Sequence, residues 1–280
     1  MPSSAEKTVL ITGCSSGIGY CVAKGLQQRG YRVFATARRA ESVAVLNAEG
    51  LESLQLDLDD SASIQQAVED ILQRSGGQLY AVFNNGAFGL PGAVEDLSRE
   101  AIRASFETNL FGWLELTNLL LPVMREQGHG RIIQNSSVLG LVVMPYRGAY
   151  NASKFALEGL SDTLRLELHD TDIHVSLIEP GPILSRFRAN GLIALQKYID
   201  IENSVHRARY QRVLERLNKQ GPAAAFTLPP EAVLKKVIHA LEARRPKARY
   251  YVTVPTYLFG YLKRVLPTFA LDRLLRLASN

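Results

Sequence analysis

The feature that most constrains the fold is an alternation of short apolar runs with helical patterns over the first two thirds of the chain. The apolar runs show no polar alternation, which is typical of strands covered on both faces; they lie at residues 7–12, 31–37, 51–58, 79–85, 130–137 and 173–181. Helical patterns occupy residues 17–29, 61–74, 99–126 and 149–168. This alternation predicts a parallel sheet with right-handed crossovers. A further apolar run predicts a seventh strand at residues 248–255.

We therefore expect an α/β fold in which one doubly wound, Rossmann-type domain with a mainly parallel seven-stranded sheet spans residues 1–280. Residues 183–230 break the strand–helix rhythm and read as amphipathic helices and loop. An insertion of this kind after a sheet strand is a candidate substrate lid, the alternative being a helical decoration of the surface. Residues 255–280 are expected to form a C-terminal helical tail.

Composition excludes several other classes of protein. The net charge of +5 comes from scattered basic residues without a patch of interleaved aromatics, which speaks against nucleic acid as a partner. Cys14 and Cys21 are the two cysteines, too few for a disulfide framework or a metal site, and they favour a reducing compartment. Residues 1–10 show no signal-peptide pattern, and no apolar run is long enough to span a bilayer. We expect a cytoplasmic protein without a metal.

A glycine-rich turn follows the first predicted strand. The sequence TGCSSGIG places Gly13, Gly17 and Gly19 between that strand and the first helix. Glycines there allow the backbone to approach a pyrophosphate, and a helix N-terminus offers free N–H groups and a positive dipole. A plain tight turn is the alternative, but the strand–turn–helix context predicts a dinucleotide site.

The end of the second predicted strand indicates which dinucleotide binds. An acidic residue there would hold the ribose 2′-hydroxyl of NAD, but this strand ends at Ala37 and is followed by Arg38 and Arg39. A guanidinium can bind the 2′-phosphate of NADP, whereas a carboxylate would repel it. Ser15 and Ser16 can add hydroxyl donors. We expect NADP(H), the alternative being that the two arginines are solvated surface residues.

A second constellation provides proton chemistry. Tyr150 and Lys154 are four residues apart on a predicted helix and share a face, while Ser137 ends the fifth predicted strand. A carbonyl that accepts a hydride at carbon needs a proton at oxygen, which a tyrosine supplies if a nearby ammonium lowers its pKa. A serine hydroxyl can hold the carbonyl oxygen. Tyr146 lacks a lysine four residues on, so we assign it to the pocket wall.

Together these motifs resemble the short-chain dehydrogenase/reductase family over roughly residues 7–185. The resemblance implies that Ser137, Tyr150, Lys154 and Asn109 form the catalytic tetrad, with Asn109 at a helix kink that holds a water in the proton relay. It implies cofactor contacts from Gly13, Ser15, Ser16, Gly17, Ile18, Gly19, Arg38, Arg39, Asp57, Leu58, Asn85, Gly86, Tyr150, Lys154, Pro180, Gly181, Ile183 and Ser185.

The chain departs from the family pattern at two places. Gly86 and Ala87 reverse the usual order of small residues after the asparagine pair, and Ser185 replaces the usual threonine. Because the residues stay small in the first case and the hydroxyl is kept in the second, we expect neither departure to disturb the chemistry.

The expected pocket walls are largely apolar, at residues 88–92, 139–146 and in the insertion. Such a pocket suits a lipophilic carbonyl compound. The motifs look most like the branch that contains 17β-hydroxysteroid dehydrogenases, retinol dehydrogenases and bacterial aldehyde reductases. Aldehyde or ketone reduction is favoured. Alternatives are an alcohol, retinol or steroid dehydrogenase working in the oxidative direction, or a non-catalytic NADP-binding sensor, which the presence of both Tyr150 and Lys154 disfavours.

The tail and the long helices bear on whether the protein contacts a membrane or a second subunit. The tail mixes leucines, aromatics and basic residues, which leaves three placements open: on a membrane surface as a peripheral contact, on the enzyme itself, or on a second subunit. The family tends to pair through its long helices, here residues 101–126 and 150–168, so the resemblance implies a homodimer or homotetramer.

Overall fold

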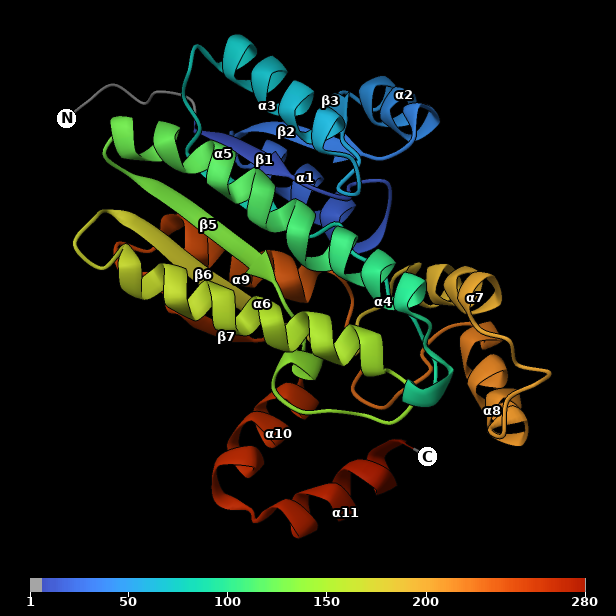
Figure 1. The fold of residues 1–280 in the computed structure, drawn as a ribbon. Coiled ribbons are helices and arrows are strands. Elements are labelled where there is room, and N and C mark those ends of the chain that lie inside the picture. The colour runs from blue at the N-terminus through green and yellow to red at the C-terminus, as the bar shows by residue number, and fades with distance from the viewer. Residues whose placement is uncertain (1–6, 280) are drawn as a thin grey trace.

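The computed structural model describes residues 7–279 and contains one seven-stranded sheet in the order β3-β2-β1-β4-β5-β6-β7, with every neighbouring pair parallel (Figure 1). The expected fold is thereby confirmed. The expectation that residues 1–10 show no signal-peptide pattern falls partly on residues 1–6, which lie outside the described residues. The strands are β1 Thr8–Ile11, β2 Arg32–Ala37, β3 Glu52–Gln55, β4 Ala81–Asn84, β5 Gly130–Asn135, β6 Ile173–Glu179 and β7 Arg249–Tyr251.

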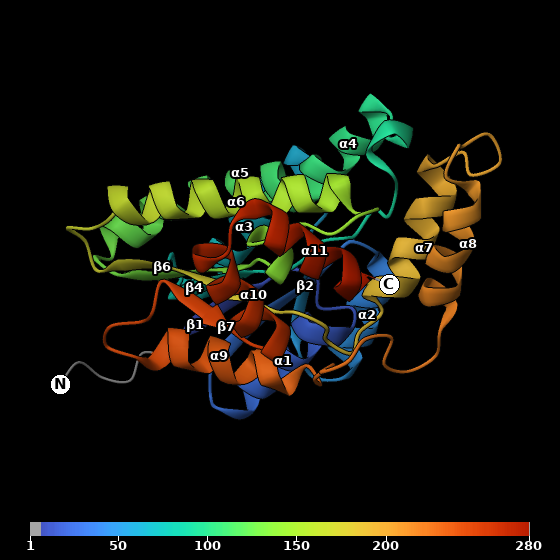
Figure 2. The same cartoon turned by 90° about the horizontal axis from the view of Figure 1, so that it is seen from below.

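Helices cover both faces of this sheet, as the two views show (Figures 1 and 2). The helices are α1 Gly17–Gln28, α2 Ala40–Ala48, α3 Ser61–Ser75, α4 Arg99–Phe106, α5 Gly112–Glu126, α6 Gly148–Glu167, α7 Phe187–Tyr198, α8 Arg207–Asn218, α9 Glu231–Glu242, α10 Val254–Val265 and α11 Thr268–Ser279. Buried side chains of α1, α2 and α9 form one core layer with the sheet, and those of α3, α5 and α6 form the other. The apolar strands are therefore buried on both faces, as their lack of polar alternation predicts.

Two details of the expected elements are wrong. The seventh strand ends at Tyr251, and residues 254–255 begin α10 because Pro255 lies in its first turn, where a missing N–H costs no hydrogen bond. The helix α2 was not expected. Leu46 is its one buried residue among the described side chains, so its apolar positions form no stripe that a sequence pattern could reveal.

The carboxyl ends of the strands meet along one edge of the sheet. Ile11 at the end of β1 pairs with Ala35 on one side and Phe83 on the other, so the loops that follow these strands lie next to one another. The loops after β5 and β6 join them through the register between Asn135 and Ile178. In an open parallel sheet this edge is the place where ligands bind.

The insertion and the tail both pack on the rest of the chain. In α8 the fully buried Tyr210 donates a hydrogen bond of 2.6 Å to Asp96 and accepts one of 2.8 Å from the N–H of Ala93. In the tail, Phe259 and Leu275 share a buried apolar cluster with residues 138–142 after β5. One face of the tail therefore lies on its own chain, one of the three placements left open. Within residues 7–279 no helix is long and apolar enough to cross a membrane.

Candidate active site

The glycine-rich turn is packed backbone against backbone. Gly13 has a φ of 71°, which favours glycine, and a Cβ there would lie 2.6 Å from the Cα of Gly86. A Cβ on Gly19 would lie 2.3 Å from the carbonyl oxygen of Gly13. These distances leave no room for a side chain, so the turn presents bare backbone at the edge of the sheet.

The first helix points its N-terminus at this turn. Ser16 is the N-cap of α1 but its side chain makes no capping hydrogen bond, and the first turn of the helix carries no acidic residue. Ser15 is exposed, whereas Gly17 and Ile18 are half-buried. Uncapped N–H groups and the positive end of the helix dipole form an anion-binding site, so these residues fit the pyrophosphate of a dinucleotide.

The loop after β4 is tied to the same turn by an asparagine. Asn85 donates from its side-chain amide to the carbonyl of Thr12 at 2.9 Å, and its own N–H donates to the Thr12 hydroxyl at 2.8 Å. The side-chain amide of Asn135 donates to the side-chain oxygen of Asn85 at 2.9 Å, and the N–H of Gly86 donates to the Thr12 hydroxyl at 2.8 Å. The ends of β1, β4 and β5 are thus fixed relative to one another.

The segment after β6 packs against the glycine-rich turn. A Cβ on Gly17 would lie 2.9 Å from the Cβ of Ser185, so the structure brings these two expected cofactor residues together. Pro180 accepts a hydrogen bond of 2.8 Å from the N–H of Val138, which fixes this segment to the loop after β5. Gly181 and Ile183 are half-buried beside it.

The remaining expected cofactor residues follow β2 and β3. Arg38 and Arg39 are exposed directly after β2, where a guanidinium can reach a phosphate. Asp57 is half-buried after β3 and donates its N–H to the Ser63 hydroxyl at 2.9 Å, while Leu58 is buried. Because β3, β2 and β1 are neighbours in the sheet, a ligand that contacts both these residues and the glycine-rich turn spans the ends of three strands.

Tyr150 and Ser137 meet at the carboxyl end of β5. Ser137 begins the short helical turn after β5 and accepts a hydrogen bond of 3.1 Å from the N–H of Leu139. Burial raises the pKa of Tyr150 to about 12, and a hydrogen bond with the Ser137 hydroxyl opposes this shift. The phenol is therefore protonated at neutral pH and held in place by the serine.

Lys154 lies one turn further along α6 and is also buried. Its ammonium donates to the carbonyl oxygen of Asn135 at 2.8 Å and lies 4.2 Å from the ring centroid of Trp113. Burial lowers the pKa of Lys154 to about 7, and the charge of Glu158 opposes this shift. Its charge is consequently sensitive to what is placed around it.

Asn109 lies in a π-helical turn between α4 and α5, so a kink of the expected kind is present. Its side chain is fully buried, accepts from the N–H of Phe88 at 3.1 Å and donates to the Phe88 carbonyl at 2.9 Å. A second donor contact reaches the hydroxyl of Ser153 on α6 at 3.3 Å. Asn109 thus connects α6 with the loop after β4.

Two residues at the site were missed at the sequence level. The indole of Trp113 donates to the carbonyl of Gly86 at 2.8 Å and so links the cofactor loop to Lys154. The ring of Phe187, the first residue of α7, lies 5.3 Å from that of Tyr150, and a Cβ on Gly89 would lie 2.7 Å from it. Trp113 is the one tryptophan of the chain, which is a usable signal, whereas nothing in the sequence singles out Phe187.

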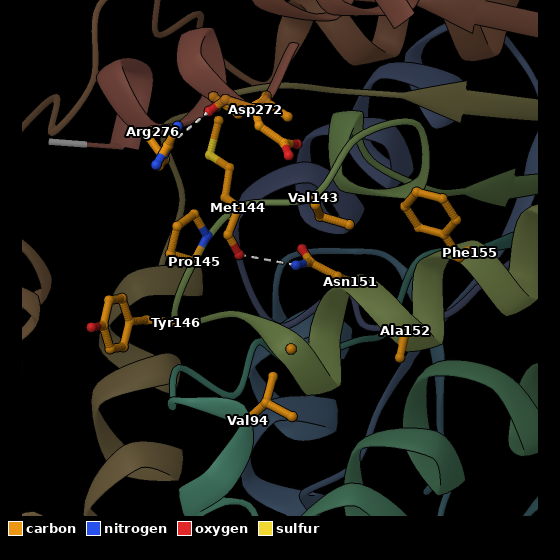
Figure 3. A pocket seen from close by; sticks show the side chains of 12 residues that line it. Val94, Val143, Met144, Pro145, Tyr146, Asn151, Ala152, Phe155, Asp272 and Arg276 are labelled. Atoms are coloured by element: carbon orange, nitrogen blue, oxygen red, sulfur yellow. Dashed lines mark hydrogen bonds between the residues drawn. The ribbon is translucent and has the colours of Figure 1, made fainter. Parts of the chain in front are cut away.

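A separate open pocket of about 640 Å³ lies on the outer side of α6 (Figure 3). Its wall includes Val143, Met144 and Tyr146 of the expected substrate wall, together with Asp272 and Arg276 of α11. Tyr146 has a φ of 59° and its hydroxyl lies 3.3 Å from His206 Nδ1, so it also connects to the insertion. The pocket does not include Ser137 or Tyr150 among its lining residues.

Comparisons with known proteins agree on one family. The family model for short chain dehydrogenases matches residues 7–192. An uncharacterized oxidoreductase of Escherichia coli, YbbO, is 42% identical over 97% of this chain and 94% of its own. Human 17-beta-hydroxysteroid dehydrogenase type 1 is 33% identical over 89% of this chain and 78% of its own. A solved actinorhodin polyketide ketoreductase with NADPH is 27% identical, covering 90% of this chain and 97% of that one, with a TM-score of 0.73.

Proposed function

Because the chain belongs to the short-chain dehydrogenase family, and is thus an oxidoreductase acting on CH–OH or C=O groups, we propose that it uses NADP(H) and acts on lipophilic aldehydes or ketones. Reduction is the direction we favour. The observation that carries the proposal is the buried Tyr150, bonded to Ser137 and one helical turn from Lys154, at the sheet edge that also holds the glycine-rich turn.

The protein's own residues supply the proton and the orientation. Bound NADPH would supply the hydride for the carbonyl carbon. The hydroxyl of Ser137 holds the carbonyl oxygen, and Tyr150 donates its proton to that oxygen. Lys154 would bind the nicotinamide ribose, and its charge stabilises the phenolate that forms when Tyr150 gives up its proton. Asn109, in its π-helical turn, holds the water through which the proton is replaced.

The preference for NADP(H) rests on Arg38 and Arg39. Both side chains are exposed directly after β2, and the strand ends in Ala37 and not in an acidic residue. A charge-assisted hydrogen bond between a guanidinium and a phosphate contributes about 1.5–3 kcal/mol, which is enough to select between the two dinucleotides.

The substrate class rests on the surroundings of Tyr150. The ring of Phe187 packs edge-on against the Tyr150 ring, and Leu139 and Val142 belong to the same buried cluster as Tyr150. These side chains are apolar, so the part of the substrate next to the carbonyl is expected to be apolar as well. We assign residues 183–230 the role of a substrate lid, since α7 begins at Phe187.

We also propose two associations for the assembled protein. Exposed apolar side chains on α5 and α6, among them Leu114, Phe155 and Leu160, offer a face for a homodimer or homotetramer. The outer side of the tail exposes Tyr261, Val265 and Phe269 near Lys263 and Arg264, which suits a peripheral contact with an anionic membrane surface. Sedimentation of the protein with and without anionic liposomes separates the two.

The function is tested by following nicotinamide absorbance with NADPH or NADH and a panel of carbonyls: decanal, retinal, a steroid ketone and a small quinone. We expect oxidation of NADPH with a lipophilic member of the panel and at least tenfold slower turnover with NADH. Tight NADPH binding with no turnover of any compound would contradict the proposed reaction while leaving the cofactor assignment in place. Faster turnover with NADH would contradict the cofactor assignment.

A further inference from the structure

Four ionisable residues follow one another along α6 at intervals of four. They are Tyr150, Lys154, Glu158 and Asp162. Residues four apart on a helix are neighbours on one face, so these side chains form a stripe. The first three are buried, with Lys154 1% exposed and Glu158 7%, whereas the side chain of Asp162 is 37% exposed. The first two belong to the proposed active site, and the third has no role in it so far.

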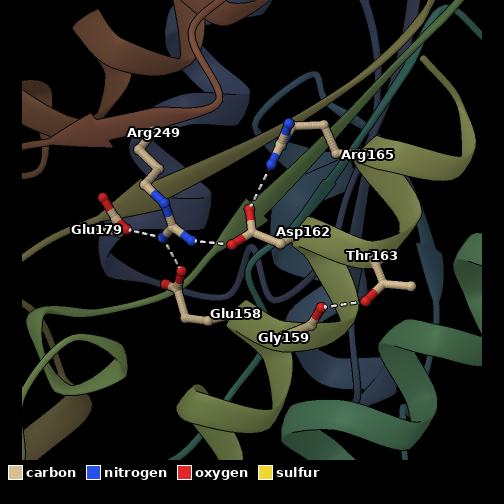
Figure 4. A network of polar contacts seen from close by, with 7 residues as sticks. All are labelled: Glu158, Gly159, Asp162, Thr163, Arg165, Glu179 and Arg249. Carbon is tan, nitrogen blue, oxygen red and sulfur yellow. Dashed lines mark hydrogen bonds and ion pairs between the residues drawn. The ribbon is translucent and has the colours of Figure 1, made fainter.

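Glu158 is held by a residue from the last strand (Figure 4). Arg249 of β7 forms ion pairs with Glu158, with Asp162 and, at 2.6 Å, with Glu179. Asp162 also pairs with Arg165 at 3.2 Å. One guanidinium therefore bridges α6, β6 and β7, and the carboxylate of Glu158 is fixed in a buried position from which it cannot turn to solvent.

Glu158 and Lys154 both lie near the carboxyl end of β5. A Cβ on Gly140 would lie 2.9 Å from Glu158 Cγ and 2.7 Å from the hydroxyl of Ser136, so Gly140 lies against both. Ser136 follows Asn135, whose carbonyl oxygen accepts the Lys154 hydrogen bond. Glu158 and Lys154 thus approach the same end of β5 from successive turns of α6.

We propose that Glu158 acts on Lys154 from the next turn of α6 as a positioning residue, whose negative charge favours the charged form of the buried lysine; this role rests on the proposed function because Lys154 acts there. An ammonium as buried as that of Lys154 loses its proton readily unless an anion is near. The ammonium of Lys154 otherwise lies near a neutral carbonyl and the rings of Trp113 and Tyr150. Arg249 acts one step further out, by orienting Glu158.

The charges that face Glu158 come from every element packed against it. They are Lys154 and Asp162 on α6, Glu179 on β6, Arg249 on β7 and Lys263 on α10. Burial and the neighbouring charge of Glu158 raise the pKa of Glu179, and the ion pair with Arg249 opposes this shift. Burial raises the pKa of Glu158 as well, and the charge of Arg249 opposes this shift and so favours the anionic form that the proposal requires.

The direct test is the pKa of Lys154 in protein labelled with ¹³C-lysine, followed through its Cε resonance and assigned by the absence of that signal in Lys154→Arg. We expect Glu158→Gln to lower the pKa of Lys154 by about one pH unit. Glu158→Asp keeps the charge and is expected to lower it by less. The matched control is Glu167→Gln on the exposed end of α6, which leaves the pKa unchanged.

An unchanged Lys154 pKa in folded Glu158→Gln protein would overturn the proposal. Should that variant fail to fold, Glu158→Met, which also removes the charge, takes its place, and an unchanged pKa there has the same meaning. The kinetic counterpart is the alkaline limb of the pH profile for carbonyl reduction, which we expect to move about one pH unit lower in Glu158→Gln. A shifted Lys154 pKa in a protein that turns over no carbonyl would refute the proposed function and leave this inference standing.

Discussion

Two sides of the candidate active site, the glycine-rich turn and the contact between Tyr150 and the insertion, are built by different means. On the side of the glycine-rich turn, backbone contacts backbone, as between Gly13 and Gly86 and between Gly19 and Gly13. On the side of the insertion the contact is between two rings, those of Tyr150 and Phe187, and Phe187 remains 38% exposed. A surface made of backbone changes shape only if the main chain moves, whereas one made of side chains changes with a single substitution.

This difference separates what is common to the reaction from what is particular to a substrate. Close-packed backbone suits a ligand of constant shape, such as a dinucleotide. A half-exposed ring on a helix suits a ligand that varies. Substitutions on the first side should therefore disturb cofactor binding and stability together, and those on the second side should alter substrate preference alone.

The largest effect is expected where the two sides meet. Tyr150→Phe removes the proton donor and should lower kcat by about 10³-fold, since general acid catalysis contributes 10²–10⁴-fold. The NADPH dissociation constant, measured by fluorescence titration, should change little. Tyr146→Phe is the matched control, because that hydroxyl faces His206. A Tyr150→Phe enzyme that kept most of its turnover would contradict the assignment.

A single methyl group should damage the backbone-built side. Gly19→Ala places a Cβ 2.3 Å from the Gly13 carbonyl oxygen, so the turn must shift, and we expect a loss of about 1–3 kcal/mol in unfolding free energy with weakened NADPH binding. Thermal unfolding with and without NADPH measures both. Gly159→Ala on α6, where a Cβ meets nothing within 4 Å, is the control and should be neutral or stabilising. Equal effects of the two variants would argue against tight packing at the turn.

Arg38, exposed directly after β2, is expected to set the preference for NADPH over NADH, which Arg38→Ala tests. Loss of one guanidinium–phosphate contact is expected to raise the KM for NADPH about 10- to 100-fold while the KM for NADH stays nearly unchanged. Arg125→Ala removes a positive charge from the exposed end of α5, outside the candidate active site, and serves as the control. Parallel changes for both cofactors would show that Arg38 does not read the 2′-phosphate.

The smallest effect is expected on the side built from side chains. Phe187→Ala opens space above Tyr150 and should change the ratio of kcat/KM between bulky and slender carbonyls by roughly three- to tenfold. NADPH affinity should not change. Ile193→Ala removes an exposed apolar side chain from the same helix and is the control. A Phe187→Ala variant with weaker NADPH binding and an unaltered substrate ratio would reverse the comparison between the two sides.

Sequence reasoning succeeds where the determinant is local. Unbroken apolar runs reveal buried parallel strands, and a spacing of four places Tyr150 and Lys154 on one helical face. Both the fold and the family were predicted in this way. The end of the seventh strand was not, since Pro255 fits equally well after a strand or at the start of a helix.

The missed residues act through contacts between distant parts of the chain. Arg249 reaches Glu158 across 91 positions, and Phe187 reaches Tyr150 from a helix in a different part of the fold. An arginine near a short strand and a phenylalanine at a helix start are both ordinary in isolation. Only the order of the strands shows that β7 lies beside β6, which brings Arg249 to Glu179 and to α6.

The contact between Gly17 and Ser185 has a consequence for biosynthesis. The glycine-rich turn emerges from the ribosome early, but the residue that lies against it is made only after β6, and Thr253, against which Gly181 packs, later still. The central strand β1 also needs β4, which is synthesised later, to complete its pairing in the sheet. A nascent chain therefore carries an unfinished candidate site through most of its synthesis, and stabilisation by a bound ligand is expected only when translation is nearly complete.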